Sequence, residues 1–432
     1  MAKTQDSRRA VCASILFALF GATGELKAVD LQEEVKWLRQ QNEALQQTMK
    51  QQQALIESLT RKVDHLEAGD GRADETEAVK KENSFGLNKV MISGEGGVGY
   101  FHSGSEGMFP KGDFRVDEAK LFVESPVFED VYFYSEINLM RRESFDLNVQ
   151  LGECYLDFEN ISKLWHRDGM MSLRLGRLDI PFGEEYIYRD AIDNPLISHS
   201  LSDFWGVDEG VELYGRIGKV SYVVAVQNGG ANQQRDFTGD KSVAGRLSYD
   251  PAKWLHLSVS GMRTGDLSPM DYWSEVYFAN GWIVPIGSTN MTLFHANLVE
   301  GDVEVKLHHA KIHAFGGYIH YDDNDPAGAN RREMYFYSVE GLHDITRKLY
   351  AGARFSQIFA PKGYPLQGNG NMGQYLFGTP STDLWRLSLG LGYRWSPNLL
   401  VKAEYSFERG KHVTGESRNH EDFFGVEAAF KF

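Results

Sequence analysis

The residues 94–99 fit the pattern G-x-G-x-x-G and follow a strand-like segment. In a dinucleotide site such glycines allow close approach to a pyrophosphate, which the N-terminus of the next helix then holds. The chain instead continues from Tyr100 to Gly104 without a helical pattern. We therefore expect these glycines to relieve crowding on a curved strand and expect no nucleotide to bind.

Two other patterns could hold metals. His308, His309 and His313 have no acidic or cysteine partner at ligand spacing, so a solvated rim is the favoured interpretation, and neither a metal nor a cofactor is expected. The acidic run 322–325 is followed by Pro326, which breaks EF-hand order and leaves weak surface calcium binding as the alternative. Since no G-x-S-x-G elbow and no assignable Ser/His or paired-acid site occurs, we do not expect an enzyme.

Further charged residues lie in segments where polar and apolar side chains alternate. If the apolar parity faces lipid, the other parity faces a lumen, where charges select ions through their field. The basic lumen candidates are Lys120, Arg174, Arg246, Lys306, Arg354, Arg386 and Lys402. The acidic ones are Glu124, Glu136, Glu212, Glu304 and Glu404. The alternative is that these side chains pair with one another and stiffen the wall.

A long segment, 181–207, opens on Pro181, Phe182 and Gly183. Loops of this length inside a compact fold are usually functional, so we expect this one to fold into the lumen and narrow it; an external lid is the alternative. Its charged candidates are Glu184, Glu185, Arg189, Asp190, Asp193 and Asp203. Facing Lys120, Arg174 and Arg246, the net negative loop predicts a transverse field and weak ion selectivity.

The elements that must position these charges are strands. The last residues place Phe424, Val426, Ala428, Phe430 and Phe432 on one parity, as in a strand with one apolar face. An edge strand of a soluble sandwich is the alternative for this segment alone. The same alternation recurs over about sixteen segments, which is typical of a membrane barrel. They are 88–101, 114–124, 130–140, 147–158, 170–180, 208–216, 219–227, 242–250, 254–264, 296–307, 312–322, 333–342, 348–359, 384–395, 399–409 and 420–432.

Connection lengths follow the same plan. Short turns at 215–219, 250–254, 308–311, 343–348 and 396–398 each follow an even-numbered strand. The long connections 181–207, 265–295 and 360–383 follow odd-numbered ones. Short turns on one rim and long loops on the other match the periplasmic and extracellular sides of an outer-membrane barrel.

The composition agrees with a barrel. The 432 residues include 20 Tyr, 26 Phe and 8 Trp, enough for aromatic girdles at both membrane interfaces. The net charge of −15 argues against a nucleic-acid partner. Of the two cysteines, Cys12 lies in an apolar run after Arg8 and Arg9, typical of a cleaved export signal, with a buried helix start as the alternative. Cys154 then has no partner for an internal disulfide.

Four regions follow from these patterns: a signal peptide at 1–28, a coiled coil at 29–68, a linker at 69–87 and the barrel at 88–432. Apolar residues in the second region recur at a and d positions of about five heptads. A trimer is favoured and a dimer is the alternative. The region 69–83 is charged and lacks large apolar side chains, as in a flexible linker.

The segment from Leu175 to Gly183, with Gly210 to Gly215 and Gln227 to Gly229, resembles the phosphate-selective porin O and P family. The resemblance covers roughly residues 88–432 and implies a trimeric sixteen-stranded barrel whose third extracellular loop lines the constriction. Some members of that family carry an N-terminal periplasmic coiled coil. Where the family often has a basic run on its second strand, this chain has Asp117 and Glu118, so acids stand where two bases would be expected.

The function expected is that of an outer-membrane porin, a passive channel for small hydrophilic and charged solutes, anionic and phosphate-like by resemblance. The alternative is a structural barrel whose coiled coil tethers the outer membrane to the periplasm or cell wall. The expected partners are outer-membrane lipid, two further copies of the chain, small ionic solutes and the barrel assembly machinery, which would recognise Phe432.

Overall fold

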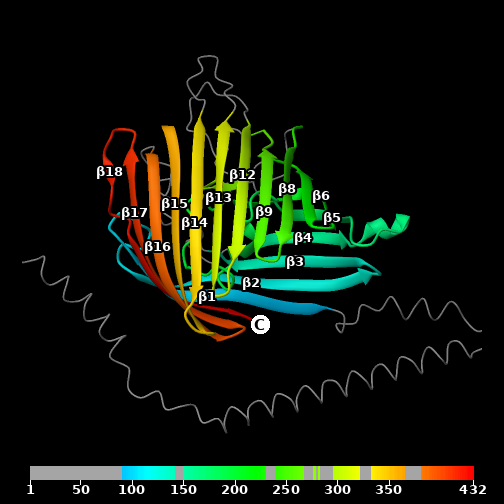
Figure 1. The fold of residues 1–432 in the computed structure, drawn as a ribbon, viewed down its shortest axis with the longest axis horizontal. Coiled ribbons are helices and arrows are strands. Elements are labelled where there is room, and N and C mark those ends of the chain that lie inside the picture. Colours follow the sequence, from blue (N-terminus) through cyan, green and yellow to red (C-terminus); the bar gives the residue numbers. More distant parts are fainter. Residues whose placement is uncertain are drawn as a thin grey trace, which may run out of the picture. The chain divides into compact units, whose positions relative to one another are not determined.

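The computed structural model describes residues 90–141, 149–229, 239–266, 276–278, 281–282, 295–321, 332–364 and 381–432 (Figure 1). The expected signal peptide, coiled coil and linker lie outside the described residues. No helix in the described part of the chain is long and apolar enough to cross a membrane.

Sixteen long strands form a closed antiparallel ring, as the alternating segments predicted. Each strand pairs with the next, and β19 closes the ring on β1, where Val98 lies opposite Ala428. The ring consists of β1 (Met91–Ser103), β2 (Asp113–Phe128), β3 (Val131–Met140), β4 (Gln150–Phe158), β5 (Ser172–Asp179), β6 (Trp205–Ile217), β7 (Val220–Gln227), β8 (Ser242–Ala252), β9 (Leu255–Arg263), β12 (Ala296–Lys306), β13 (Ala310–Tyr321), β14 (Glu333–Asp344), β15 (Leu349–Tyr364), β16 (Ser381–Ser396), β17 (Leu399–His412) and β19 (Phe423–Lys431).

Short elements accompany the ring. β10 (Val276–Phe278) pairs with β11 (Gly281–Trp282) and with β6, and β18 (Ser417–Arg418) pairs with β17. Two 3₁₀ helices occur in connections, η2 (Ile161–Trp165) between β4 and β5 and η3 (Glu185–Tyr188) between β5 and β6.

Side chains alternate between the outer and the inner face of the ring. On β19, Phe424 and Val426 are 40% and 39% exposed, whereas Glu427 and Ala429, on the opposite parity of the same strand, are buried. The outer face of β16 likewise exposes Leu389 and Leu391. The apolar parity therefore faces outward, as expected of a sheet whose outer surface meets lipid.

The two rims differ in the way that the connection lengths predicted. Close turns join β6 to β7, β8 to β9, β12 to β13, β14 to β15 and β16 to β17 at what we call the short-turn rim. The connections at the opposite rim are longer than these five turns, and the one after β5 spans residues 180–204. The β4–β5 connection, which carries η2, is a longer exception at the short-turn rim.

The glycines of β1 have the structural role that the sequence predicted. β1 continues as a strand through all of them and shifts its register with β2 between Gly97 and Val98. A Cβ on Gly99 would collide with the carbonyl oxygen of Val426 on β19. The glycines therefore permit close approach of neighbouring strands, and no helix follows in place of the strand.

Candidate functional site

The connection between β5 and β6, residues 180–204, folds into the ring and is called the inner loop below. Its turn at Gly183 has φ +66°, a left-handed conformation that glycine adopts without strain. The Gly183 N–H donates to Ser260 Oγ on β9 at 2.9 Å, and its carbonyl accepts from Arg246 on β8 at 2.5 Å. A Cβ at Gly183 would also meet the Glu300 carboxylate on β12, so the loop passes close to the wall here.

The far end of the inner loop is fixed to β15 and β17. The Ile197 and Ser198 N–H groups donate to Glu404 at 2.6 and 2.8 Å, and the Leu201 N–H donates to Ser356 Oγ at 3.1 Å. A buried irregular backbone must satisfy its polar groups, and here strand side chains do so. The loop therefore has a defined course across the lumen.

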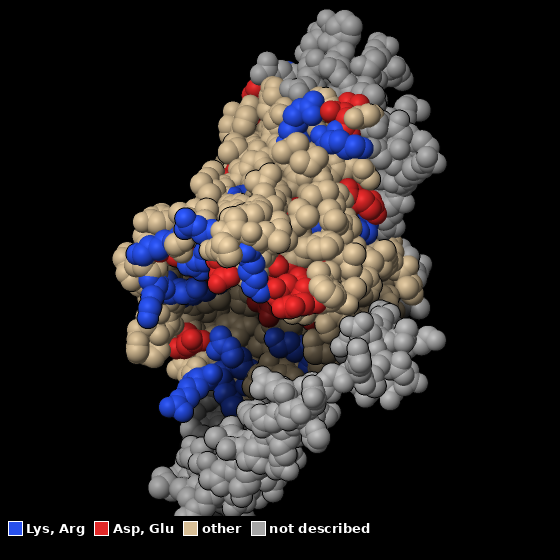
Figure 2. Space-filling model, turned by 90° about the vertical axis from the view of Figure 1, so that its right-hand side faces the viewer, with Lys and Arg blue, Asp and Glu red and all other residues tan. Residues whose placement is uncertain are grey.

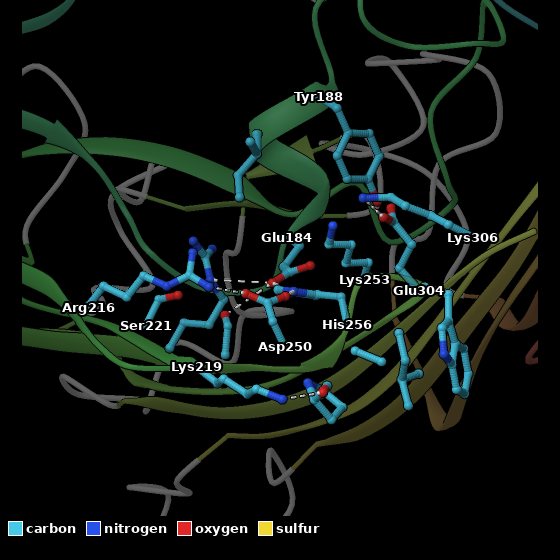
Figure 3. A pocket seen from close by; sticks show the side chains of 17 residues that line it. Glu184, Tyr188, Arg216, Lys219, Ser221, Asp250, Lys253, His256, Glu304 and Lys306 are labelled. Carbon is cyan, nitrogen blue, oxygen red and sulfur yellow. Dashed lines mark hydrogen bonds and ion pairs between the residues drawn. The ribbon is translucent and has the colours of Figure 1, made fainter.

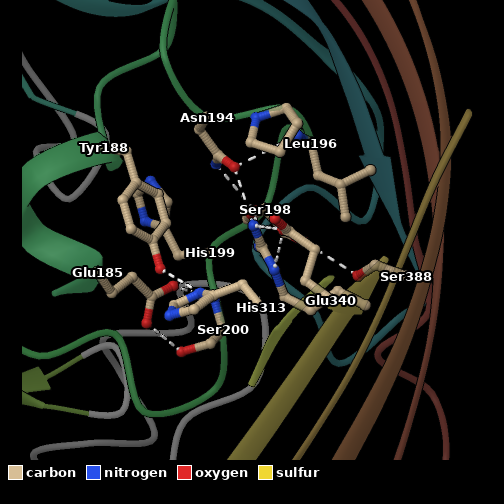
Figure 4. Close-up of polar contacts among 12 residues, drawn as sticks. Glu185, Tyr188, Asn194, Leu196, Ser198, His199, Ser200, His313, Glu340 and Ser388 are labelled. Atoms are coloured by element: carbon tan, nitrogen blue, oxygen red, sulfur yellow. Dashed lines mark hydrogen bonds and ion pairs between the residues drawn. The ribbon is translucent and has the colours of Figure 1, made fainter. Parts of the chain in front are cut away.

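Three cations expected to line the lumen instead hold the inner loop. Lys402 donates to the carbonyls of Ala191, Asn194 and Leu196 at 2.7, 3.2 and 3.0 Å. Arg354 and Arg386 donate to the carbonyls of Ser198 and His199 at 2.6 and 3.1 Å. All three cations face inward, as their parity predicted, but they are 4% exposed or less. Figure 4 shows part of this contact region between the loop and the strands.

An apolar cluster underlies the two ends of the inner loop. Ile180, Phe182, Leu201 and Phe204 join buried side chains from β8, β9 and β12 through β16, and the rings of Phe182 and Phe204 are 4.4 Å apart. This corrects the expectation of a polar inner face throughout the barrel. The apolar side of the loop must be removed from water, so the strands beneath it carry apolar inward residues.

Open space lies on the other side of the inner loop, along β1 to β8, and at the short-turn rim it extends to β9 and β12. Three cavities, of about 850, 290 and 400 Å³, follow one another in that order from the short-turn rim inward. Each cavity shares lining residues with the next. Arg246 lines all three. In Figure 2 the face shown is hollowed, and basic and acidic side chains gather around the hollow. We call strands β1 to β8 the open side and β9 to β17 the filled side.

The largest of these three cavities opens near the short-turn rim (Figure 3). Lys306 lines it, as expected, and forms an ion pair with Glu304 at 2.8 Å; Lys311 pairs with the same carboxylate at 2.7 Å. The remaining charged lining residues are Glu184, Arg216, Lys219, Arg246, Asp250, Lys253 and His256. Cations outnumber acids here, five to three with His256 neutral, so this mouth is basic.

The narrow region around Arg246 combines wall and loop groups. Arg246 lies 3.7 Å from Glu184 and donates to the Tyr186 hydroxyl at 3.0 Å. Burial raises the pKa of Tyr186 to about 12, so the phenol adds no negative charge near neutral pH. On the wall, Arg174 pairs with Asp157 at 2.8 Å and with Glu212 at 3.1 Å.

Lys120 lies further along the open side and is contacted by three acids. It pairs with Asp190 of the inner loop, with Glu118 at 3.1 Å and with Glu95 at 3.9 Å. Glu136 lines the same 400 Å³ cavity. The structure thus brings Lys120, Glu136, Arg174 and Arg246 to one continuous set of cavities, with Glu212 beside Arg174.

The charged residues of the inner loop divide into two groups. Glu184 and Asp190 face wall cations, as expected of a transverse field. Glu185 is instead bound to Ser200, and Arg189 pairs with Asp203 at 3.2 Å, both within the loop. Burial alone would raise the pKa of Asp203, but Arg189 and His199 hold that pKa below its usual range. Asp193 is exposed and lines none of the three cavities.

Some functional candidates were missed by the parity argument. Glu95, Glu118, Glu153 and Asp179 line the 400 Å³ cavity. Glu153 has the same parity as Asp157 on β4, so alternation could have found it. Glu95 lies among glycines, so no alternation of apolar and polar side chains identifies which face it is on.

The three histidines of the expected solvated rim divide. His308 and His309 lie at the short-turn rim as expected, but His313 is 4% exposed, so a solvated rim is the wrong interpretation for it.

A closed ring with an apolar outer face and a loop folded across its lumen has the architecture of an outer-membrane porin barrel. No protein-family model and no curated protein sequence matches the chain. Solved structures do match. The outer membrane channel DcaP of Acinetobacter baumannii has a TM-score of 0.52 at 14% identity, over 80% of this chain and 99% of its own.

Two further structures show the same likeness. The anion-selective porin from Comamonas acidovorans has a TM-score of 0.51 at 9% identity, over 79% of this chain and 98% of its own. OmpT, an outer membrane protein of Vibrio cholerae, has a TM-score of 0.51 at 12% identity, over 79% of this chain and 97% of its own. At such identities the likeness establishes the porin-type barrel fold, and the resemblance to the phosphate-selective family stays a prediction.

Proposed function

We propose that the protein is an outer-membrane porin that lets small hydrophilic, charged solutes diffuse through its open side. The observation that carries this proposal is the series of three adjoining cavities lined by Arg246. Lumen charges such as those beside Arg246 select ions by electrostatic field, and the route needs no covalent chemistry. The Comamonas acidovorans protein of similar fold is an anion-selective porin, which supports the same class of function.

Anions, including phosphate-like solutes, are the proposed preference. The basic mouth of the 850 Å³ cavity would concentrate anions before they reach Arg246. Acids further inward oppose this effect, because Glu95, Glu118, Glu153 and Asp179 line the 400 Å³ cavity. We therefore expect a weak preference for anions.

A plugged structural barrel is the second candidate, because the inner loop and its apolar cluster close the filled side. Single-channel recording in planar bilayers separates the two functions. Stepwise conductance that scales with salt concentration supports the porin. Purified protein that inserts, as shown by protease protection in vesicles, and passes no current would leave the tether as the better function.

The proposed location is the outer membrane, with the short-turn rim and residues 29–68 in the periplasm and three chains in the assembly. The OmpT of Vibrio cholerae has been solved in a trimer form. Deleting residues 29–68 should leave a folded barrel but lower the yield of trimer, because the coiled coil raises the local concentration of the chains. Cross-linking and heat-modifiable gel migration measure this yield. A full-length chain that runs as a monomer would contradict the proposal.

Phe432 is the proposed signal for the barrel assembly machinery. It is 67% exposed, and its backbone pairs with Gly94 on β1 through N–H···O bonds of 2.9 and 3.1 Å. Because the Phe432 side chain is mostly exposed, Phe432→Ser should reduce insertion more than stability. Membrane fractionation measures insertion, with Phe128→Ser at the short-turn rim as an exposed control. Equal outer-membrane levels for the two variants would argue against such a signal.

A further inference from the structure

Two buried side chains lie behind the 850 Å³ cavity, on neighbouring strands of the filled side. Asp302 on β12 and His313 on β13 have side chains that are 0% and 4% exposed. Asp302 Oδ1 and His313 Nε2 approach to 3.5 Å. Within the described part of the chain, neither atom has a hydrogen-bond partner of good geometry. Buried polar atoms without partners are costly, which indicates that something else satisfies them.

The inner loop adds a third donor to this pair. One carboxylate oxygen of Glu184 can be grouped with donor atoms of Asp302 and His313 so that all three lie within 4.8 Å of one another. The geometry points to a divalent transition-metal site that joins the inner loop to the barrel wall through Glu184, Asp302 and His313. A nitrogen with two carboxylate oxygens suits Zn²⁺ and neighbouring first-row ions.

The distances are compatible with such an ion. Donor atoms bound to tetrahedral Zn²⁺ at about 2.0–2.1 Å lie roughly 3.4 Å from one another. Asp302 Oδ1 and His313 Nε2 already have nearly this separation. A Glu184 oxygen, within 4.8 Å of the other two donor atoms, would have to move closer to them, and water would complete the coordination.

Each proposed ligand also has a partner that fixes its orientation. The Tyr188 hydroxyl and His313 Nδ1 share a 2.7 Å hydrogen bond, which leaves Nε2 to face the ion (Figure 4). Ser258 Oγ donates to Asp302 Oδ2 at 3.0 Å, which leaves Oδ1 facing His313. His256 contacts Glu184 Oε1 at 2.8 Å. Such outer contacts are characteristic of metal ligands.

An ion could reach the site from the short-turn rim. Glu184 lines the 850 Å³ cavity, whereas Asp302 and His313 lie behind it. A bound cation would join Glu184, at the start of η3, to Asp302 on β12 and His313 on β13. It would also neutralise Glu184, which lies 3.7 Å from Arg246. The site would therefore stiffen the inner loop and strengthen the positive field at the narrow region.

A buried ion pair between protonated His313 and Asp302 is the competing explanation, and zinc binding tests it directly. Chelator-treated protein in detergent is titrated with ZnCl₂ by equilibrium dialysis. Wild type should bind one Zn²⁺ per chain saturably, and His313→Gln and Asp302→Asn should lose that binding. Tyr188→Phe should weaken it about 10- to 100-fold, because it removes the outer contact to His313.

Two histidine variants serve as matched controls. His309→Gln changes an exposed histidine at the short-turn rim, and His295→Gln removes the histidine of a separate group with Asp240 and Asp266. Both should retain the binding, and all variants should keep heat-modifiable migration as proof of folding. Absence of saturable binding to wild type, equal binding to His313→Gln, or loss of binding in His295→Gln alone would overturn the site.

The consequence for conduction is measured separately. Zinc added at the short-turn side of a planar bilayer should shift the reversal potential toward anions in wild type and not in His313→Gln. Zinc binding to solubilised protein needs no conducting pore, so failure of the proposed porin function would leave the binding test intact. Bound zinc with an unchanged reversal potential would overturn the link between the ion and the field at Arg246.

Discussion

The open and the filled sides of the barrel use the same kinds of inward residues for different purposes. On the open side, Arg246 donates to the Gly183 carbonyl and the Tyr186 hydroxyl of the loop and makes one loose ion pair with Glu184, yet it still lines three cavities. On the filled side, Lys402 is 1% exposed. Its ammonium group donates to carbonyls of the loop backbone and pairs with Glu427, 2.9 Å away. A charge in a porin-type wall is therefore a structural anchor wherever a loop covers it, and a field-producing group only where space remains.

The largest effect should come from the apolar cluster that holds the filled side shut. Phe182→Ala removes a fully buried ring that packs against Phe204. It should lower the free energy of unfolding by about 3–5 kcal/mol. Thermal unfolding in detergent measures this, and Phe128→Ala, which truncates an exposed ring, should change it little. Equal stabilities would show that the loop does not depend on this cluster.

The second-largest effect should come from removing Lys402, which anchors the inner loop, and it should affect both the filled and the open side of the barrel. Lys402→Met leaves the loop carbonyls and Glu427 without their cation, and breaking such a buried pair costs about 3–5 kcal/mol, partly relieved here if the loop moves away. We expect lower stability together with larger, noisier conductance steps. Single-channel recording measures this, with the exposed Lys111→Met as control. Conductance steps with the size and the low noise of the wild type would mean that the loop keeps its place without Lys402.

On the open side, Arg246→Ala should change selectivity and should lower stability less than Lys402→Met. Arg246 donates to one loop carbonyl and one hydroxyl, whereas Lys402 donates to three loop carbonyls. At about 4 Å two unit charges interact by about 4 kcal/mol at an effective dielectric near 20, so loss of this cation should leave Glu184 dominant and shift preference toward cations several-fold. Reversal potential in a salt gradient measures the shift. An unchanged potential in the double variant Arg246→Ala with Arg174→Ala would show that neither residue lies at the narrow region.

The smallest effect is expected for Arg174→Ala alone. Arg174 is balanced by Asp157 and Glu212 on its own wall, so its field partly cancels before it reaches the lumen. Its removal should shift the reversal potential in the same direction as Arg246→Ala but by less. A larger shift for Arg174→Ala would reverse the assignment of Arg246 as the main cation of the narrow region.

The strands and rims could be predicted from the sequence because they depend on local patterns. Alternation decides which residues lie on the outer face, as at Phe424 and Val426. The length of each connection decides at which rim it joins two consecutive strands. The long segment after β5 was expected to enter the lumen, and its charges were identified individually. The resemblance to a porin family agreed with the fold that the solved structures share.

The pairing of those charges could only be decided by the tertiary structure. Parity tells that Lys402 and Arg246 both face inward, but not that Lys402 meets Asn194 and Leu196 while Arg246 borders open space. Asp302 and His313 come together through the register of β12 and β13, and Glu184 reaches them across more than a hundred residues of sequence. Alternation is a property of neighbouring residues in one strand, whereas a site in a barrel is made by ring closure and by the course of a loop, both of which depend on contacts distant in the chain.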